Sequence, residues 1–168
     1  MSLARAVCLL TTSFLAGPTV ADADAWPQWF GPQRDGVWRE TGIVDRLPKA
    51  PDYRWRVPIG AGYAGPAVAN GRIFVTDRQL ASDASNPEDP FQTGRIAGTE
   101  RVICLEEKTG EQLWLHEYDC PYTVSYAAGP RATPTVDGDL VYTLGTEGNL
   151  LCRDATTGEV KWSRDFKE

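Results

Sequence analysis

Residues 104–114 have the sequence CLEEKTGEQLW, and residues 152–162 have the sequence CRDATTGEVKW. The two segments start 48 residues apart and share cysteine, an acidic residue, Thr-Gly, glutamate and tryptophan in one register. The matched pairs are Cys104/Cys152, Glu106/Asp154, Thr109/Thr157, Gly110/Gly158, Glu111/Glu159 and Trp114/Trp162. A match of this length at a single offset indicates an internal repeat.

Each copy predicts a strand, a tight turn and a second strand. Short apolar runs at residues 102–105 and 150–152 precede acidic residues that are expected to cap the turns. Gly110 and Gly158 supply the positive φ that such turns need. Four residues later comes a tryptophan, which we expect to clamp neighbouring units, because one buried indole removes about 150–250 Å² from water. The predicted structural docking motif consists of Glu106, Gly110, Trp114, Asp154, Gly158 and Trp162.

The composition limits the class of protein. Of 168 residues, 42% are apolar, and there are 16 Gly, 12 Pro and 6 Trp, which favours a globular chain of strands and turns. The 17 basic and 23 acidic residues give a net charge of −6. Because this charge repels phosphate backbones, we expect no nucleic-acid partner.

The amino-terminal residues are typical of a secretory signal peptide, predicted over residues 1–23. Arg5 precedes an apolar segment, residues 6–16, that is too short to span a bilayer. Rival A-x-A sites place the cleavage after residue 21, 23 or 25. Since no later segment has the composition of a transmembrane helix, we expect an exported protein, either periplasmic or secreted.

Two further segments predict β-hairpins. Residues 65–76 contain an Asn-Gly pair, the strongest short hairpin signal, and residues 133–143 contain Asp137-Gly138 at the expected turn. The hairpins lie 68 residues apart rather than 48, which indicates an insertion in the first unit. We place it in a polar surface loop over residues 77–100.

These segments together predict two units of four short antiparallel strands, the arrangement of β-propeller blades. Within a blade region of residues 53–168, the first blade is expected over residues 65–118 and the second over residues 130–168. The predicted strands cover residues 67–69, 72–76, 102–105 and 112–118, then 134–136, 140–144, 150–153 and 160–166. Two blades cannot close a ring, so we expect an all-β, incomplete propeller. It is either the amino-terminal fragment of a longer propeller or a truncated or split one.

An arm and linker, residues 24–52, precede the blades. Residues 26–37, WPQWFGPQRDGV, are dense in Pro, Gly and Trp, which excludes a regular helix or central strand. We expect an extended arm anchored by its two tryptophans. Residues 53–57 alternate like a half-buried strand, and Trp55 is expected to play the role that Trp114 plays before the second blade.

These residues resemble the pyrroloquinoline-quinone-like (PQQ-like) β-propeller repeat family, whose docking motif is A-x-[DN]-x-x-T-G-x-x-x-W. Residues 152–162 fit it with cysteine in the alanine position, and residues 104–114 fit it with glutamate in the Asp position. The arm and residues 126–137, YAAGPRATPTVD, are similar to exported bacterial members, especially a many-copy group of planctomycetes.

The resemblance implies two alternative functions. Quinoprotein alcohol dehydrogenases of this family hold PQQ and calcium with a catalytic Asp and, in many, adjacent cysteines; no residue here matches that Asp, and no Cys-Cys pair occurs. We therefore predict no catalytic, cofactor-binding or metal-binding residue. A non-catalytic binding or scaffold surface, as in the family's outer-membrane assembly member, is the first hypothesis, and a portion of a PQQ- and calcium-dependent oxidoreductase is the alternative.

Two loops are candidates for partner binding. Residues 122–131, YTVSYAAGPR, precede the inner strand of the second blade, and residues 60–65, GAGYAG, precede that of the first. We expect Tyr63, Tyr126 and Arg131 to contact a partner, most simply a protein, with the guanidinium holding a carboxylate. The simpler interpretations are packing within the loops and contact with remaining propeller blades.

The cysteines and the histidine predict no reactive site. Equivalent positions of stacked sheets lie about 10 Å apart, too far for a disulfide, so Cys104 and Cys152 are expected to be buried apolar side chains. Cys120 is expected to be free or paired outside the chain. His116, next to Trp114, is expected to be a surface residue.

Overall fold

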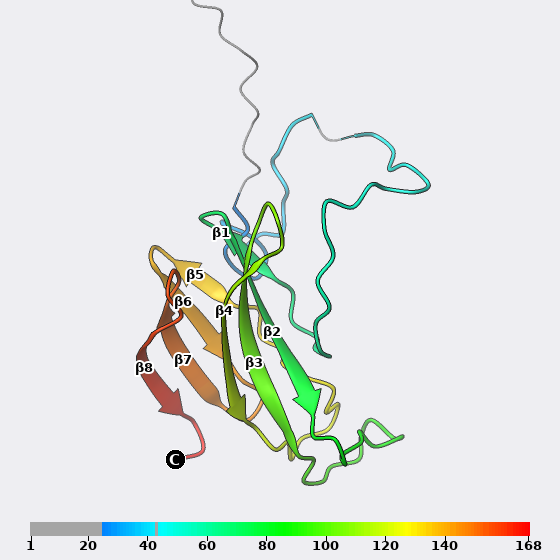
Figure 1. Ribbon diagram of the computed structural model, residues 1–168, viewed down its shortest axis with the longest axis vertical. Coiled ribbons are helices and arrows are strands. Elements are labelled where there is room, and N and C mark those ends of the chain that lie inside the picture. The colour runs from blue at the N-terminus through cyan, green and yellow to red at the C-terminus, as the bar shows by residue number, and fades with distance from the viewer. Residues whose placement is uncertain (1–24, 43) are drawn as a thin grey trace, which may run out of the picture.

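The computed structural model describes residues 25–42 and 44–168, and the predicted signal peptide lies outside them. Eight strands form two four-stranded antiparallel sheets, with no helix among these residues (Figure 1). The first sheet contains β1 (Ala67–Ala69), β2 (Arg72–Leu80), β3 (Gly98–Glu106) and β4 (Gln112–Asp119). The second contains β5 (Thr135–Asp137), β6 (Leu140–Leu144), β7 (Asn149–Asp154) and β8 (Val160–Asp165). The prediction of two four-stranded blades is confirmed.

The sheets pack face to face, and their inner strands β1 and β5 lie next to each other. Small and apolar side chains from both sheets fill the space between them, which removes apolar surface from water. This core contains Ala67, Ala69, Phe74, Cys104, Val136, Val141 and Ala155, with Trp114 packed against it. Cys104 and Cys152 are buried free thiols, as predicted.

The hairpin turns follow the chemistry of their residues. Asn70 and Gly71 have φ of +55° and +70°, the conformation that a type I′ turn requires. In the second blade the turn residues are Gly138 (φ +57°) and Asp139, because Asp137 is the last residue of β5 and pairs with β6. The expected position of this turn is therefore wrong by one residue.

The two Thr-Gly turns have the same hydrogen bonds. In the first, the Glu106 carboxylate accepts from the Thr109 N–H at 2.6 Å, and the Gly110 N–H donates to the Glu106 carbonyl at 2.9 Å. In the second, the Asp154 carboxylate accepts from the Thr157 N–H at 3.0 Å. Hydrogen bonds from Thr109 lower the pKa of Glu106, and the bond from Thr157 lowers the pKa of Asp154 to about 2.

Trp114 clamps the first blade to the second. A Cβ atom at Gly158 would lie 2.7 Å from Cδ2 of Trp114, so the indole rests directly on the glycine backbone. The glycine has φ of +76°. The indole N–H also donates to the Ala155 carbonyl at 3.2 Å. A glycine is required here both for its positive φ and for the space that the indole occupies.

Trp55 makes the same contact with the first blade. A Cβ at Gly110 would lie 2.6 Å from Cδ2 of Trp55, and the indole N–H donates to the Glu107 carbonyl at 3.0 Å. Trp55 thus plays the role of Trp114, as expected. The strand predicted at residues 53–57 is wrong, because that backbone has no neighbouring strand to pair with in the described part of the chain.

Trp162 has the same place within its own blade as Trp114. Its ring centroid lies 6.0 Å from that of Tyr142, and that of Trp114 lies 5.9 Å from that of Phe74. Trp162 is 42% exposed, however, because no Thr-Gly turn covers it among the described residues. The two tryptophans therefore have equivalent places in their blades, but the outer face of Trp114 is covered by a Thr-Gly turn and that of Trp162 is exposed.

The prediction of a polar surface loop over residues 77–100 is wrong at both ends. β2 continues to Leu80 and β3 begins at Gly98, so that residues 81–97 form the connection. Asp77, Arg78 and Glu100 are buried within the extended strands. Their polar composition favoured a loop, but their charges are compensated by partners that are distant in sequence.

The arm binds the inner edges of both blades. Trp26 and Val68 of β1 exchange two backbone hydrogen bonds of 2.8 and 2.9 Å, and the Pro27 carbonyl accepts from the N–H of Val136 in β5 at 2.8 Å. Trp29 is 61% exposed, so one tryptophan anchors the arm rather than two.

Candidate functional site

Four connecting segments lie at one end of the two sheets. Because the strands alternate in direction, the β2–β3, β4–β5 and β6–β7 connections meet at that end, near the bottom of Figure 1. The segment before β1 runs beside the end of β2, where Ala61 pairs with Arg78. We call this end the loop face; it comprises residues 60–66, 81–97, 120–134 and 145–148. Hydrogen bonds join these loops: the Pro130 carbonyl accepts from the Tyr63 N–H at 2.8 Å, and Ile96 exchanges two backbone bonds of 2.9 Å with Tyr122.

The structure brings the three predicted partner-binding residues together on the loop face. Arg131 donates through Nη2 to the carbonyls of Ser125 at 2.6 Å and Tyr126 at 2.8 Å. Its guanidinium carbon lies 5.6 Å from the centroid of the Tyr63 ring, within the range of a cation–π contact. Tyr63 is 52% exposed and Tyr126 is 40% exposed. The two loops therefore contribute to one exposed group of side chains.

Phe91 completes this group and was not among the predicted residues. Its ring lies edge-on to that of Tyr126, with centroids 5.1 Å apart and planes at 76°. It is 70% exposed. The sequence signal that could have identified Phe91 is its place as a single aromatic residue within a polar insertion. We call Tyr63, Phe91, Tyr126 and Arg131 the aromatic–arginine cluster.

Tyr126 holds an uncommon backbone conformation. Its φ is +52°, in the left-handed region, which costs a non-glycine residue about 1–2 kcal/mol. The Pro90 carbonyl accepts from its N–H at 2.7 Å, and its own carbonyl accepts from Arg131. Strained residues that the surrounding contacts hold in place are concentrated at functional sites.

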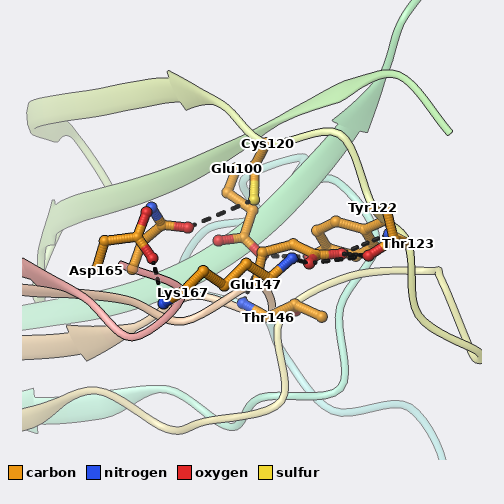
Figure 2. Close-up of polar contacts among 9 residues, drawn as sticks. Glu100, Cys120, Tyr122, Thr123, Thr146, Glu147, Asp165 and Lys167 are labelled. Carbon is orange, nitrogen blue, oxygen red and sulfur yellow. Dashed lines mark hydrogen bonds and ion pairs between the residues drawn. The ribbon is translucent and has the colours of Figure 1, made fainter. Parts of the chain in front are cut away.

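A buried carboxylate lies beneath the loop face and joins the two blades. Glu100, 1% exposed, comes from β3. It accepts from the Tyr118 hydroxyl at 2.5 Å. It also accepts from the Tyr122 hydroxyl and from the Thr146 N–H at 2.9 Å (Figure 2). Burial raises the pKa of both tyrosines. Because Thr146 belongs to the β6–β7 turn, this carboxylate links the first blade to the second.

A second carboxylate, that of Glu147, belongs to the residue that follows Thr146 in the β6–β7 turn. Glu147 accepts from the Thr123 N–H at 2.5 Å and forms an ion pair with Lys167. Cys120 lies close by, and its thiol donates to the Asn149 side chain at 3.8 Å (Figure 2). The contacts of Glu100 and Glu147 thus fix the β6–β7 turn against the β4–β5 connection.

The buried charges of the extended strands are also compensated. Asp77 accepts from Arg101 at 2.7 and 2.5 Å and from the Gly60 N–H. Arg78 lies over the Tyr122 ring at 3.8 Å from its centroid, and its two terminal nitrogens each donate to a backbone carbonyl at 2.7 Å. With every charge held in this way, these groups brace the loops and present no acid, base or nucleophile to solvent.

The family comparison agrees with this geometry. A family model described as outer membrane protein assembly factor BamB, one of the PQQ-like repeat models, matches residues 37–168, most of the chain. The chain belongs to the PQQ-like repeat family. No curated protein matched this PQQ-like repeat chain. A solved structure titled europium-containing methanol dehydrogenase matches with 18% identity and a TM-score of 0.29. That match covers 62% of this chain and 25% of the dehydrogenase, and it carries no argument about activity.

In residues 25–42 and 44–168, no group of three or more His, Cys, Asp or Glu side chains is arranged to hold a metal ion. His116 is half-buried against Tyr118 rather than fully on the surface, and burial lowers its pKa. Within the same residues, no helix is long and apolar enough to cross a membrane.

The buried thiols are expected to resist alkylation. Burial raises the pKa of Cys104 to about 11 and that of Cys120 to about 12, so at pH 8 only about one thiol in a thousand or fewer is ionised. We expect iodoacetamide at pH 8 to leave both cysteines unmodified in the native chain and to modify both in urea, as measured by peptide mass spectrometry. Rapid native labelling of Cys120 would show that this part of the loop face is open.

Proposed function

We propose that this chain is an exported, non-catalytic PQQ-like propeller protein whose loop face binds a protein partner. The observation that carries the proposal is the aromatic–arginine cluster, in which three separate loops present exposed side chains next to one another. The predicted signal peptide supports export. The many-copy bacterial group noted from the sequence is proposed to include relatives of this chain.

The chemistry of the cluster supports protein binding. Tyrosine and arginine are enriched among the residues that dominate protein interfaces, because they combine large contact area with directional polar groups. Here the arginine is held by two carbonyls and one ring, and Tyr126 by contacts on both of its backbone groups. A surface fixed in this way loses little conformational entropy when a partner binds.

The open side of the second blade supports a second kind of partner, further propeller blades. Trp162 is exposed where Trp114 is covered by a Thr-Gly turn. We propose that a turn of the same type from another blade covers Trp162. We propose that the whole protein is likewise non-catalytic. The alternative is a PQQ- and calcium-dependent oxidoreductase, which the reconstitution assay below tests.

Site-specific photocrosslinking tests the protein-binding role. With p-benzoylphenylalanine in place of Tyr63 or Tyr126, we expect irradiated cells of the native host to give one adduct with the same protein from both positions. Tyr53 is the matched control, since it is 63% exposed and lies outside the loop face. Equal adducts from all three positions, or none from the loop face, would argue against the proposal.

Reconstitution tests the catalytic alternative separately. We expect the full-length protein with added PQQ and calcium to give no alcohol-dependent dye reduction above a sample without PQQ. Turnover in that assay would replace the non-catalytic proposal with the oxidoreductase.

A further inference from the structure

We propose that the aromatic–arginine cluster binds a carboxylate carried by an extended segment of a protein partner, with aromatic or aliphatic residues beside that carboxylate. This inference rests on the proposed function and names the chemistry of the partner. The inference depends on which donors of Arg131 already have hydrogen-bond partners in the chain and which are open to a ligand.

Arg131 has unused donors on its exposed side chain. Both of its hydrogen bonds to the chain are made by Nη2, to the carbonyls of Ser125 and Tyr126. Nε and Nη1 have no hydrogen-bond partner in the described part of the chain. Nε–H and Nη1–H point away from each other, because Cδ lies between them, so each can donate one charge-assisted hydrogen bond to a carboxylate oxygen.

The guanidinium is oriented before any partner arrives. The two carbonyls hold one nitrogen, and the Tyr63 ring lies 5.6 Å from the guanidinium carbon. An arginine side chain that is free in solution loses rotamer entropy when it is fixed at an interface. That loss is reduced here, because internal contacts already fix the side chain.

The surroundings select an apolar neighbour for the carboxylate. Tyr63, Phe91 and Tyr126 flank the arginine with exposed rings. The nearby Asp89 carboxylate is engaged, because it accepts from the Phe91 N–H at 2.9 Å. Aromatic and aliphatic side chains of the partner would bury these rings, while its carboxylate pairs with the guanidinium.

The charge of the chain favours a protein over a polyanion. The net charge is −6, and the cluster contains one cation. A single arginine within an acidic protein attracts an isolated carboxylate at short range, whereas a phosphate backbone or an anionic membrane requires several neighbouring basic residues.

Peptide titration of the full chain tests the inference. The probes are Ac-Gly-Phe-Asp-Phe-Gly-NH₂ and its Asn-for-Asp analogue, and the readout is the backbone amide resonances of Tyr63 and Tyr126 in nitrogen-15-labelled protein, which Arg131→Gln retains. We expect the Asp peptide to bind at least about tenfold more tightly than the Asn peptide, as a charge-assisted hydrogen bond implies. Arg131→Gln should abolish this preference, and added salt should reduce it.

The matched control is Arg164→Gln, which removes one positive charge from an exposed arginine on β8. It should leave both affinities unchanged. Equal binding of the two peptides, or no binding of either up to about 10 mM, would overturn the carboxylate inference. The photocrosslinks at positions 63 and 126 decide the proposed function independently, so the two failures are distinguishable.

Discussion

Replacing Glu100 by alanine is expected to lower the free energy of unfolding by about 3–5 kcal/mol. The variant leaves three donors without an acceptor: the buried Tyr122 hydroxyl, and the part-buried Tyr118 hydroxyl and Thr146 N–H. Each unsatisfied buried donor costs about 1–3 kcal/mol, and partial rearrangement reduces the sum. Urea titration followed by circular dichroism measures the loss.

Glu117→Ala is the matched control for this variant. Glu117 is an exposed residue of β4, and its loss should change the free energy of unfolding by less than about 0.5 kcal/mol. Should Glu100→Ala fail to fold, Glu100→Gln retains one acceptor oxygen and should show a smaller loss. A Glu100→Ala chain as stable as the Glu117→Ala chain would contradict the assignment of this carboxylate as the joint between the blades.

Gly158→Ala is expected to destabilise the chain by about 2–5 kcal/mol. The positive φ of +76° costs alanine about 1–2 kcal/mol. The added Cβ also falls 2.7 Å from the Trp114 ring, and such overpacking costs about 1–3 kcal/mol. The loss is measured by the same urea titration.

Gly138→Ala separates these two causes. Its φ of +57° imposes the same kind of backbone cost, but no atom lies within 4 Å of the new Cβ. We expect a loss of about 1 kcal/mol at this position. If Gly158→Ala and Gly138→Ala were equally destabilising, the indole would not rest on the Gly158 backbone as described.

The docking motif was predictable from sequence because it depends on local chemistry. An acidic cap, a Thr-Gly turn and a tryptophan four residues later fix one another within 11 residues, so two copies at one offset were sufficient. The prediction that Trp55 contacts the first blade as Trp114 contacts the second was also correct. The strand expected around it was wrong, since alternation of side chains indicates a strand only where a neighbour can pair.

The extended strands of the first blade were not predictable from composition. The sequence of residues 77–80 and 98–100 is polar, and polar runs near Asn-Pro and Asp-Pro favour loops. Their burial depends on partners that are distant in sequence, such as Arg101 for Asp77 and Tyr122 for Arg78. No periodicity within the segment records those contacts.

The candidate site was predicted in part for the same reason. Tyr63, Tyr126 and Arg131 stand in loops that precede equivalent inner strands, so the repeat itself placed them at one end. Phe91 belongs to an insertion with no counterpart in the second blade. Its position depends on the fold of that insertion, which brings Pro90 against the Tyr126 backbone.

The central claim is that the indole of one blade rests on the turn glycine of the next. The most direct test is a double-mutant cycle between Trp114→Ala and Gly158→Ala, measured by urea unfolding in sucrose so that every variant stays folded. We predict that Gly158→Ala costs about 1–2 kcal/mol in the Trp114→Ala background and about 2–5 kcal/mol in the parent chain. An equal cost in both backgrounds would contradict the account.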